Sequence, residues 1–125
     1  MATPALKLSQ ISIVMLGVKD LPRSVAFYRD TLGMAVQAEN PEFAFLSGGG
    51  VTLALSLPLA KATGQSAGAT EVVFAVEDVT AAYATLRARS VVFTHEPRNV
   101  TGTSWAANFN DPDGHRLSIF GPKTK

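Results

Sequence analysis

The sequence predicts an α+β fold made of two similar halves, each with one helix and four strands. Residues 14–18 are apolar at every second position and lead to Asp20. Residues 72–76 repeat this pattern and lead to Asp78, which lies 58 positions after Asp20. Such alternation is typical of a strand with one buried face. An aspartate after the strand can cap the helix that follows. The repeat therefore predicts a duplicated unit.

The first half is expected to begin with a strand over residues 11–18, followed by a helix over residues 21–32. Pro22 suits the first helical turn, where its missing N–H group costs no hydrogen bond. Gly33 suits a left-handed cap that ends the helix. Three strands are then expected, over residues 34–39, 42–46 and 51–57.

Residues 58–69 are rich in Ala, Gly, Ser and Lys, and they are expected to link module 9–57 to module 70–121. After the strand over residues 71–76, Asp78 is expected to cap a helix with an apolar stripe. That stripe consists of Val79, Tyr83 and Leu86. The second half is expected to end with strands over residues 91–94, 104–109 and 116–120, the last two joined by a turn at residues 111–114.

Composition sets limits on the class of protein. A length of 125 residues, of which 46% are hydrophobic, predicts a single domain over residues 1–125. A net charge of +1 without a basic stripe argues against a nucleic-acid partner. The chain has no cysteine, which fits a reducing, cytoplasmic compartment. Residues 1–10 lack a signal-peptide pattern, and no apolar run has the ~20 residues that span a bilayer.

Several short motifs together carry a family resemblance. They are Asp20-Leu21, Ser24, Phe27-Tyr28, Leu32-Gly33, Phe74, Val76, Asp78, and the run from Phe109 through Asp111-Pro112-Asp113-Gly114-His115 to Leu117 and Ile119. In order and spacing the chain resembles the vicinal-oxygen-chelate superfamily, which includes glyoxalase I, extradiol dioxygenases, and fosfomycin- and bleomycin-resistance proteins. The resemblance implies two βαβββ modules that form a curved mixed sheet around a cup, with the helices outside. It also implies a homodimer and, in many members, one divalent metal.

The resemblance also implies where four metal ligands would lie. The first lies seven residues before each capping aspartate, at Ile13 and Glu71, and the others fall at Ser118 and near Ala54. A divalent metal normally takes three or four N, O or S donors from the protein. Of these four side chains, Glu71 alone is a strong donor. We therefore expect the family's metal site to be absent, and we predict no metal and no cofactor.

The alternation predicts which residues line the cup. If Val14, Leu16 and Val18 pack on the helices, the positions between them point inward. The predicted ligand-binding residues are Ile13, Met15, Phe43, Phe45, Ala54, Glu71, Val73, Trp105, Arg116 and Ser118.

Three of these positions leave alternatives open. Glu71 is the candidate catalytic residue, because desolvation in an apolar cup would raise its pKa and make it a general base. Alternatively, it is exposed or paired with Arg116. Trp105 is expected either to stack on a flat ligand or to fill the core. The aromatic pair Phe43 and Phe45 lines either the cup or a dimer interface.

The sequence also predicts the surroundings of the two histidines and of the acidic turn. His115 follows Gly114 in a turn and is expected to be exposed. His95 lies at a strand end, in a loop that is either solvated or a polar rim of the cup. Asp111 and Asp113 fit a tight turn rather than a calcium loop, which needs donors at alternating positions.

The sequence thus favours a protein that binds a small molecule without a metal and sequesters a drug-like or apolar ligand. The alternative is a metal-dependent lyase, isomerase or dioxygenase of the same superfamily. Its metal would be held by a different set of donors, such as Glu71, His95 or Glu42. A third possibility is a structural protein whose cup has collapsed into core.

Overall fold

The structure is a computed structural model, which describes residue 6, residues 8–65 and residues 67–123. Its first half runs from strand β1 (Ile13–Gly17) through helix α1 (Leu21–Ala26) and a π-helical turn η1 (Phe27–Thr31) to three strands. These strands are β2 (Val36–Glu39), β3 (Phe43–Ser47) and β4 (Thr52–Ser56). The first six elements thus follow the expected order of strand, helix and three strands.

The second half repeats this order after helix α2 (Leu57–Thr63). Strand β5 (Glu71–Ala75) leads into helix α3 (Val79–Ala88), and three strands follow. They are β6 (Arg98–Asn99), β7 (Trp105–Asn110) and β8 (Arg116–Gly121).

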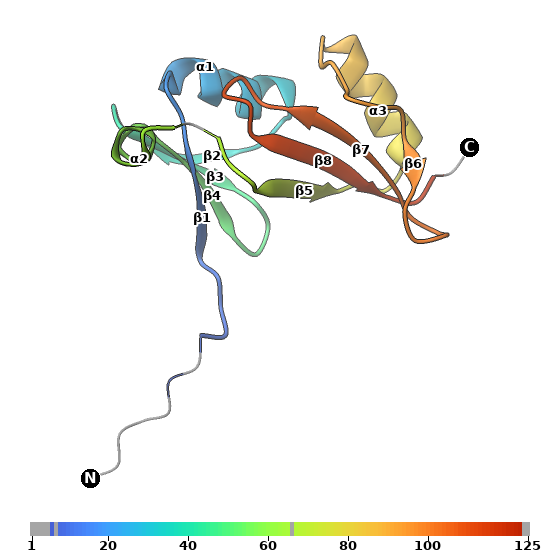
Figure 1. The fold of residues 1–125 in the computed structure, drawn as a ribbon, viewed down its shortest axis with the longest axis horizontal. Coiled ribbons are helices and arrows are strands. Elements are labelled where there is room, and N and C mark those ends of the chain that lie inside the picture. The colour runs from blue at the N-terminus through green and yellow to red at the C-terminus, as the bar shows by residue number, and fades with distance from the viewer. Residues whose placement is uncertain (1–5, 7, 66, 124–125) are drawn as a thin grey trace.

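Each half forms one mixed four-stranded sheet, with strand orders β1-β4-β3-β2 and β5-β8-β7-β6. In each sheet the first strand pairs in parallel with the last, while the remaining pairs are antiparallel. Figure 1 shows α1 and α3 on one side of the two sheets. The predicted α+β fold of two βαβββ modules is therefore confirmed, with two sheets that do not close into one.

Two aspartates start the helices as predicted. Asp20 accepts a hydrogen bond from the backbone N–H of Arg23, and Asp78 accepts from those of Thr80 and Ala81. Helix α1 ends in the π-helical turn, where the Leu32 N–H donates to the carbonyl of Phe27. Gly33 follows with φ of 81°, so the predicted left-handed cap is present.

The expected linker contains a helix that composition did not predict. Ser56 caps α2 by accepting from the Leu59 N–H, Pro58 lies in the first turn, and Gly64 ends the helix with φ of 74°. Helix α2 packs against β1 at Gly17, where an added Cβ would lie 3.0 Å from the backbone N of Ala60. Within this linker, Ser66 lies outside the described residues, as do residues 1–5 and 7 of the N-terminal segment considered above.

The prediction of a strand over residues 91–94 is wrong. This segment makes a single bridge, between Phe93 and Phe109, and the third strand is instead the two-residue β6. Thr94 also donates its backbone N–H to the carbonyl of Asn108, but Pro97 lacks an N–H group with which to continue a ladder. The segment therefore bends along β7 instead of pairing with it.

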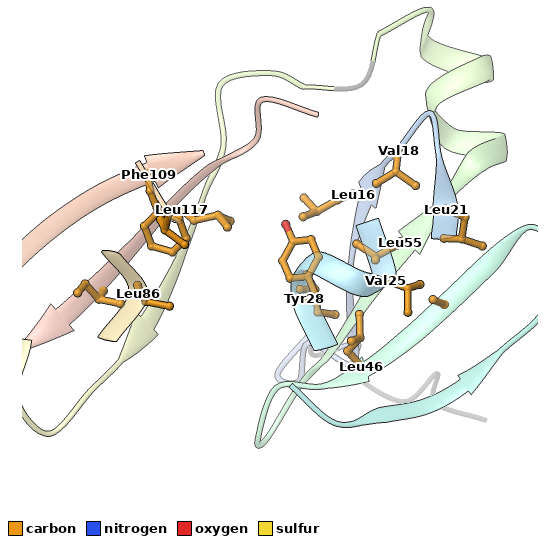
Figure 2. Packing of buried hydrophobic residues seen from close by; sticks show 14 of the residues in the cluster. Leu16, Val18, Leu21, Val25, Tyr28, Leu46, Leu55, Leu86, Phe109 and Leu117 are labelled. Atoms are coloured by element: carbon orange, nitrogen blue, oxygen red, sulfur yellow. The ribbon is translucent and has the colours of Figure 1, made fainter. Parts of the chain in front are cut away.

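The hydrophobic core lies between the sheets and the helices. Figure 2 shows Leu16, Val18, Leu46 and Leu55 gathered with α1 in the first half, and Leu86, Phe109 and Leu117 packed in the second. All of these side chains are at least nine-tenths buried. Because the core occupies the helix side of each sheet, the opposite side of each sheet is available for a site.

Candidate functional site

Each sheet presents one face that the core does not cover, and strand register identifies its side chains. In the first half, Leu46 and Leu53 belong to the core, so the alternate positions point away from it. We call these positions the first open face: Ile13, Met15, Phe43, Phe45, Ser47, Thr52, Ala54 and Ser56. By the same argument the second open face comprises Glu71, Val73, Ala75, Arg98, Ala106, Asn108, Asn110, Arg116, Ser118 and Phe120.

The first open face carries no charged side chain. Strands β1, β3 and β4 contain apolar residues, small residues, serines and one threonine. The rings of Phe43 and Phe45 are nearly parallel, with centroids 6.0 Å apart and an interplanar angle of 16°. Ile13 and Met15 remain 46% and 40% exposed. An exposed apolar and aromatic surface of this kind suits a flat apolar ligand or a protein partner.

The second open face is polar at its centre and at one end. Arg116 Nε donates to Glu71 Oε1 at 2.5 Å, and the two side chains form an ion pair. This hydrogen bond lowers the pKa of Glu71, and the nearby Ser118 and Asn108 side chains act in the same direction, while partial burial of the carboxyl opposes them. Glu71 is therefore an ionised partner of Arg116. The raised pKa expected for a general base is not found.

His95 joins the second open face through its side chain. Its Nε2 lies 2.8 Å from Asn108 Oδ1, and its Nδ1 lies 2.7 Å from the carbonyl oxygen of Glu96. The orientation of the Asn108 amide is fixed because its nitrogen donates to the carbonyl of Leu117. Both ring nitrogens of His95 thus lie within hydrogen-bond distance of an oxygen atom.

The structure distributes the ten predicted site residues over three places. Ile13, Met15, Phe43, Phe45 and Ala54 lie on the first open face. Glu71, Val73, Arg116 and Ser118 lie on the second. Trp105 instead packs against the core, with Lys123 Nζ 4.4 Å from its ring centroid. Its contacts are those of the core-filling alternative.

Asn108 had no assigned role in the predicted site, and His95 was considered as a possible rim residue or alternative metal donor. Asn108 is 6% exposed, its Oδ1 lies 2.8 Å from His95 Nε2, and it helps to lower the pKa of Glu71. The alternation that places Ala107 and Phe109 in the core could have placed Asn108 on the open face. The contact of His95 could not have been found in this way, because its loop forms no regular strand.

Two cavities bring the halves together beside the open faces. A cleft of about 710 Å³ lies along β5 and is lined by Glu71, Val73 and Thr52 among others. A smaller cavity of about 210 Å³ lies between β1 and β5, and its lining includes Met15, Glu71 and His115. Glu71 is therefore the predicted site residue that lines both cavities.

The residues at the family's ligand positions do not fit a metal ion. Ile13 and Ala54 have no donor atoms, Ser118 offers a hydroxyl, and the Glu71 carboxylate is paired with Arg116. Within the described residues, no group of three or more His, Asp or Glu side chains is placed to hold a metal. We derive no reaction through a metal in this chain.

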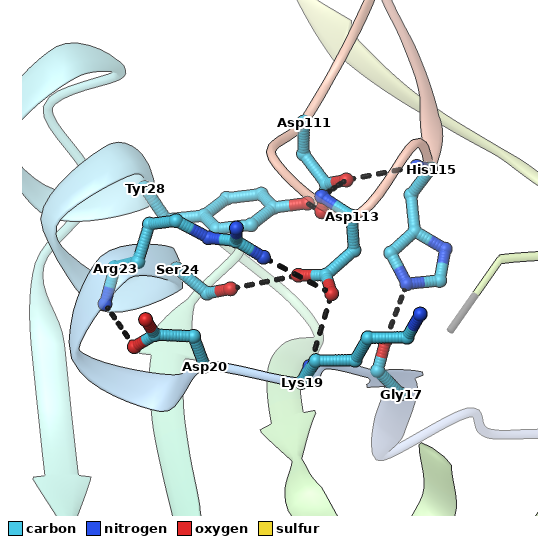
Figure 3. Close-up of polar contacts among 9 residues, drawn as sticks. All are labelled: Gly17, Lys19, Asp20, Arg23, Ser24, Tyr28, Asp111, Asp113 and His115. Carbon is cyan, nitrogen blue, oxygen red and sulfur yellow. Dashed lines mark hydrogen bonds and ion pairs between the residues drawn. The ribbon is translucent and has the colours of Figure 1, made fainter. Parts of the chain in front are cut away.

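The turn before β8 joins the two halves, as Figure 3 shows. Asp111 accepts from the Tyr28 hydroxyl at 2.8 Å, and Asp113 accepts from the Ser24 hydroxyl and the Lys19 N–H. Burial, with a further effect of Asp111, raises the pKa of Tyr28 far above its ordinary value. These acids hold the halves together, which agrees with a structural turn rather than a calcium loop.

His115 was expected to be exposed, and this prediction is wrong. The residue is 5% exposed, and its Nε2 lies 2.6 Å from the carbonyl oxygen of Gly17 in β1. Its backbone N–H donates to Asp111. The turn folds back onto the edge of the first sheet, which buries the ring between the two halves.

Comparison with known proteins identifies the family. The family model of the Glyoxalase/Bleomycin resistance protein/Dioxygenase superfamily matches residues 10–119. The chain therefore belongs to this superfamily, and the resemblance stated above is confirmed. A lactoylglutathione lyase from Haemophilus influenzae is 32% identical over 136 aligned positions, which cover 92% of this chain and 94% of that protein.

Solved structures agree with this assignment. A superfamily member from Sphaerobacter thermophilus is 26% identical, with a TM-score of 0.76 over 92% of this chain and 98% of that one. An antibiotic binding protein from a Streptomyces species has a TM-score of 0.77 over 95% of this chain and 100% of that one. At 23% identity, this second likeness shows the fold alone.

Proposed function

We propose that this protein binds a small organic molecule on its open faces without a metal. The observation that carries the proposal is the character of the four family ligand positions, which are Ile13, Ala54, Glu71 and Ser118. Apolar surface with a few placed polar groups is what small-molecule sites generally offer. The antibiotic-binding neighbour supports the proposal through its fold, because it is a protein of this architecture that serves binding.

The proposal includes a second copy of the chain. Ile13, Met15 and Val73 are 46%, 40% and 53% exposed, and large apolar side chains grouped in this way mark an interaction surface. A homodimer would bring the open faces of two copies together and complete the cup. The proposal also places the protein in the cytoplasm, which the absence of cysteine from the sequence supports.

A thermal-shift screen of aromatic compounds in the presence of EDTA tests the binding function. A ligand of the native state raises the melting temperature, because it stabilises the folded form by RT ln(1 + [L]/Kd). Val73→Ser is expected to reduce the shift that a hit produces. Val92→Ser is the matched control, since Val92 is 84% exposed and lies outside the open faces.

Two results of the thermal-shift screen would contradict the proposal. If no compound stabilises the protein, or if hits stabilise both variants and the original chain equally, binding on the open faces is wrong. Sedimentation analysis tests the dimer separately. A chain that stays monomeric at high concentration would remove the second copy from the site.

A second candidate function is a metal-dependent lyase. The observation in its favour is the 32% identity to a lactoylglutathione lyase over nearly the whole of both chains. Activity on a glutathione hemithioacetal in the presence of added Zn²⁺ or Ni²⁺, absent from the Glu71→Gln variant, would support this function over the first.

A further inference from the structure

The second open face already holds one carboxylate, and that carboxylate belongs to the protein itself. Glu71 extends from β5 over β8, where Arg116 Nε donates to it. Ser118 and Asn108 lie next to this pair on the same face, and both help to lower the pKa of the Glu71 carboxyl. Ser118 is 2% exposed and Asn108 is 6% exposed, so both donors are fixed by their surroundings. These three side chains form a preorganised site for a carboxylate.

The second open face carries two arginines, Arg116 beside Glu71 and Arg98 at the other end of the face. Arg98 lies on the same face, because it pairs with Ala106, which in turn pairs with Phe120. Its guanidinium makes no ion pair with a described residue. Against Arg98 and Arg116, Glu71 supplies one carboxylate on the face, and the Glu96 carboxylate makes no hydrogen bond with the described residues.

A ligand carboxylate can replace Glu71 as the partner of Arg116 at a small cost in free energy. Their side chains are 35% and 55% exposed, and exposed ion pairs contribute little to stability. Glu71 lies on an edge strand of its sheet, beside the 710 Å³ cleft, so its side chain has open space to enter. A planar carboxylate from a ligand would gain the same donors, and arginine binds such groups with two parallel hydrogen bonds.

Apolar side chains lie directly beside this site. Val73 is paired with Ser118 in the register and is 53% exposed, and Phe120 is two residues farther along β8. A flat ring attached to a carboxylate would rest on these two side chains while its acid reaches Arg116. The first open face, which has no charge, offers no comparable acid site.

We infer that the ligand is an aromatic carboxylic acid, whose carboxylate displaces Glu71 from Arg116, Ser118 and Asn108. This inference rests on the proposed binding function and adds the class of ligand. It also gives Glu71 a defined role as an internal competitor for the ligand. If Glu71 itself held or activated the ligand, Glu71→Gln would weaken ligand binding. Because Glu71 is a competitor, Glu71→Gln strengthens ligand binding instead.

Isothermal titration with 2-naphthoate and its uncharged counterpart 2-naphthamide tests the inference. We expect naphthoate to bind about tenfold more tightly, which is the scale of one charge-assisted interaction. Arg116→Gln should abolish this preference, and Glu71→Gln should increase naphthoate affinity further. Arg87→Gln is the matched control, because it removes the same charge from α3, where Arg87 lies over the ring of Tyr83. A loss of folded protein cannot imitate the expected gain in Glu71→Gln.

Each contrary result is specific. Equal affinity for the two probes overturns the carboxylate inference but leaves the binding function standing. Weaker naphthoate binding by Glu71→Gln overturns the competitor role. An equal loss of the preference for naphthoate in Arg87→Gln and Arg116→Gln overturns the role of Arg116. If neither probe binds, the ligand class is wrong, and the EDTA thermal-shift screen decides the binding function independently.

Discussion

The two halves of this protein share a scaffold but differ at the turn before their last strand. In the first half this turn is the glycine run at residues 48–50. In the second half it carries Asp111, Asp113 and His115, which bind Tyr28, Ser24 and Gly17 across the junction. This turn thus bonds the two halves, together with Arg89, which donates to the carbonyl of Thr31, while the glycine turn borders the 710 Å³ cleft. The repeated scaffold supports two uses, a polar junction and an open cleft.

The open faces diverge in the same way. Ile13 and Glu71 hold equivalent places 58 positions apart, yet one is apolar and the other is an ion-pair partner. Ala54 and Ser118 also hold equivalent places, paired with β1 and β5 respectively, and one is apolar while the other carries a hydroxyl. Residues that build the scaffold are alike in the two halves, and residues on the open faces or at the junction are different.

The largest expected effect comes from breaking the polar junction at Asp111. Its carboxylate accepts from the Tyr28 hydroxyl and from two backbone N–H groups, and it is 5% exposed. Asp111→Ala leaves all three donors buried without a partner, so we expect a loss of about 3 kcal/mol in the free energy of unfolding, measured with urea. Asp30→Ala is the control, because Asp30 is an exposed partner of Arg29. Equal stability of the two variants would contradict the role of the junction.

Tyr28 should show a smaller effect at the same place. Tyr28→Phe removes one hydrogen bond to a buried carboxylate, with an expected loss of about 2 kcal/mol. The chain's other tyrosine provides the control, and Tyr83→Phe should change stability little. Because the pKa of Tyr28 is raised, its contribution is fully present below the ordinary tyrosine pKa and declines as pH rises above it. Tyr28→Phe should therefore weaken the loss of stability above about pH 10. An unchanged alkaline profile would count against this assignment.

The smallest expected effect concerns the ion pair on the second open face. The pKa of Glu71 is lowered, so its stabilising effect is present above the ordinary glutamate pKa and is lost as pH falls through the lower, folded-state value. Glu71→Gln should lower the melting temperature slightly at pH 7 and not at pH 3. The effect is small because the pair is exposed to solvent. If the difference in melting temperature between Glu71→Gln and the original chain grows on acidification, this role of the ion pair is contradicted.

The sequence predicted the parts of the fold that depend on local chemistry. Asp20 and Asp78 cap their helices, and strict alternation placed Ile13, Met15 and Glu71 on faces turned away from the core. Helix α2 was missed because composition was weighed above its local signals, which are Ser56, Pro58 and Gly64.

Contacts between distant residues account for the remaining differences. His115 follows a glycine turn and looks exposed locally, but it is buried by Gly17, which lies 98 positions away. The pairing of Glu71 with Arg116 was one of two alternatives, and strand register decides it by placing the residues opposite each other. No local pattern reports the pKa of Glu71, because that value depends on side chains from β7 and β8.

The central claim is that the chain binds its ligand without a metal, and metal content tests this most directly. The chain should be purified without a chelator, dialysed against Zn²⁺, Ni²⁺, Mn²⁺ and Fe²⁺ in turn, desalted, and analysed by inductively coupled plasma mass spectrometry. The account predicts far less than one ion per chain for each metal, since Glu71 is the single strong donor at the four family positions. Retention of one ion per chain, lost in Glu71→Gln, would contradict it.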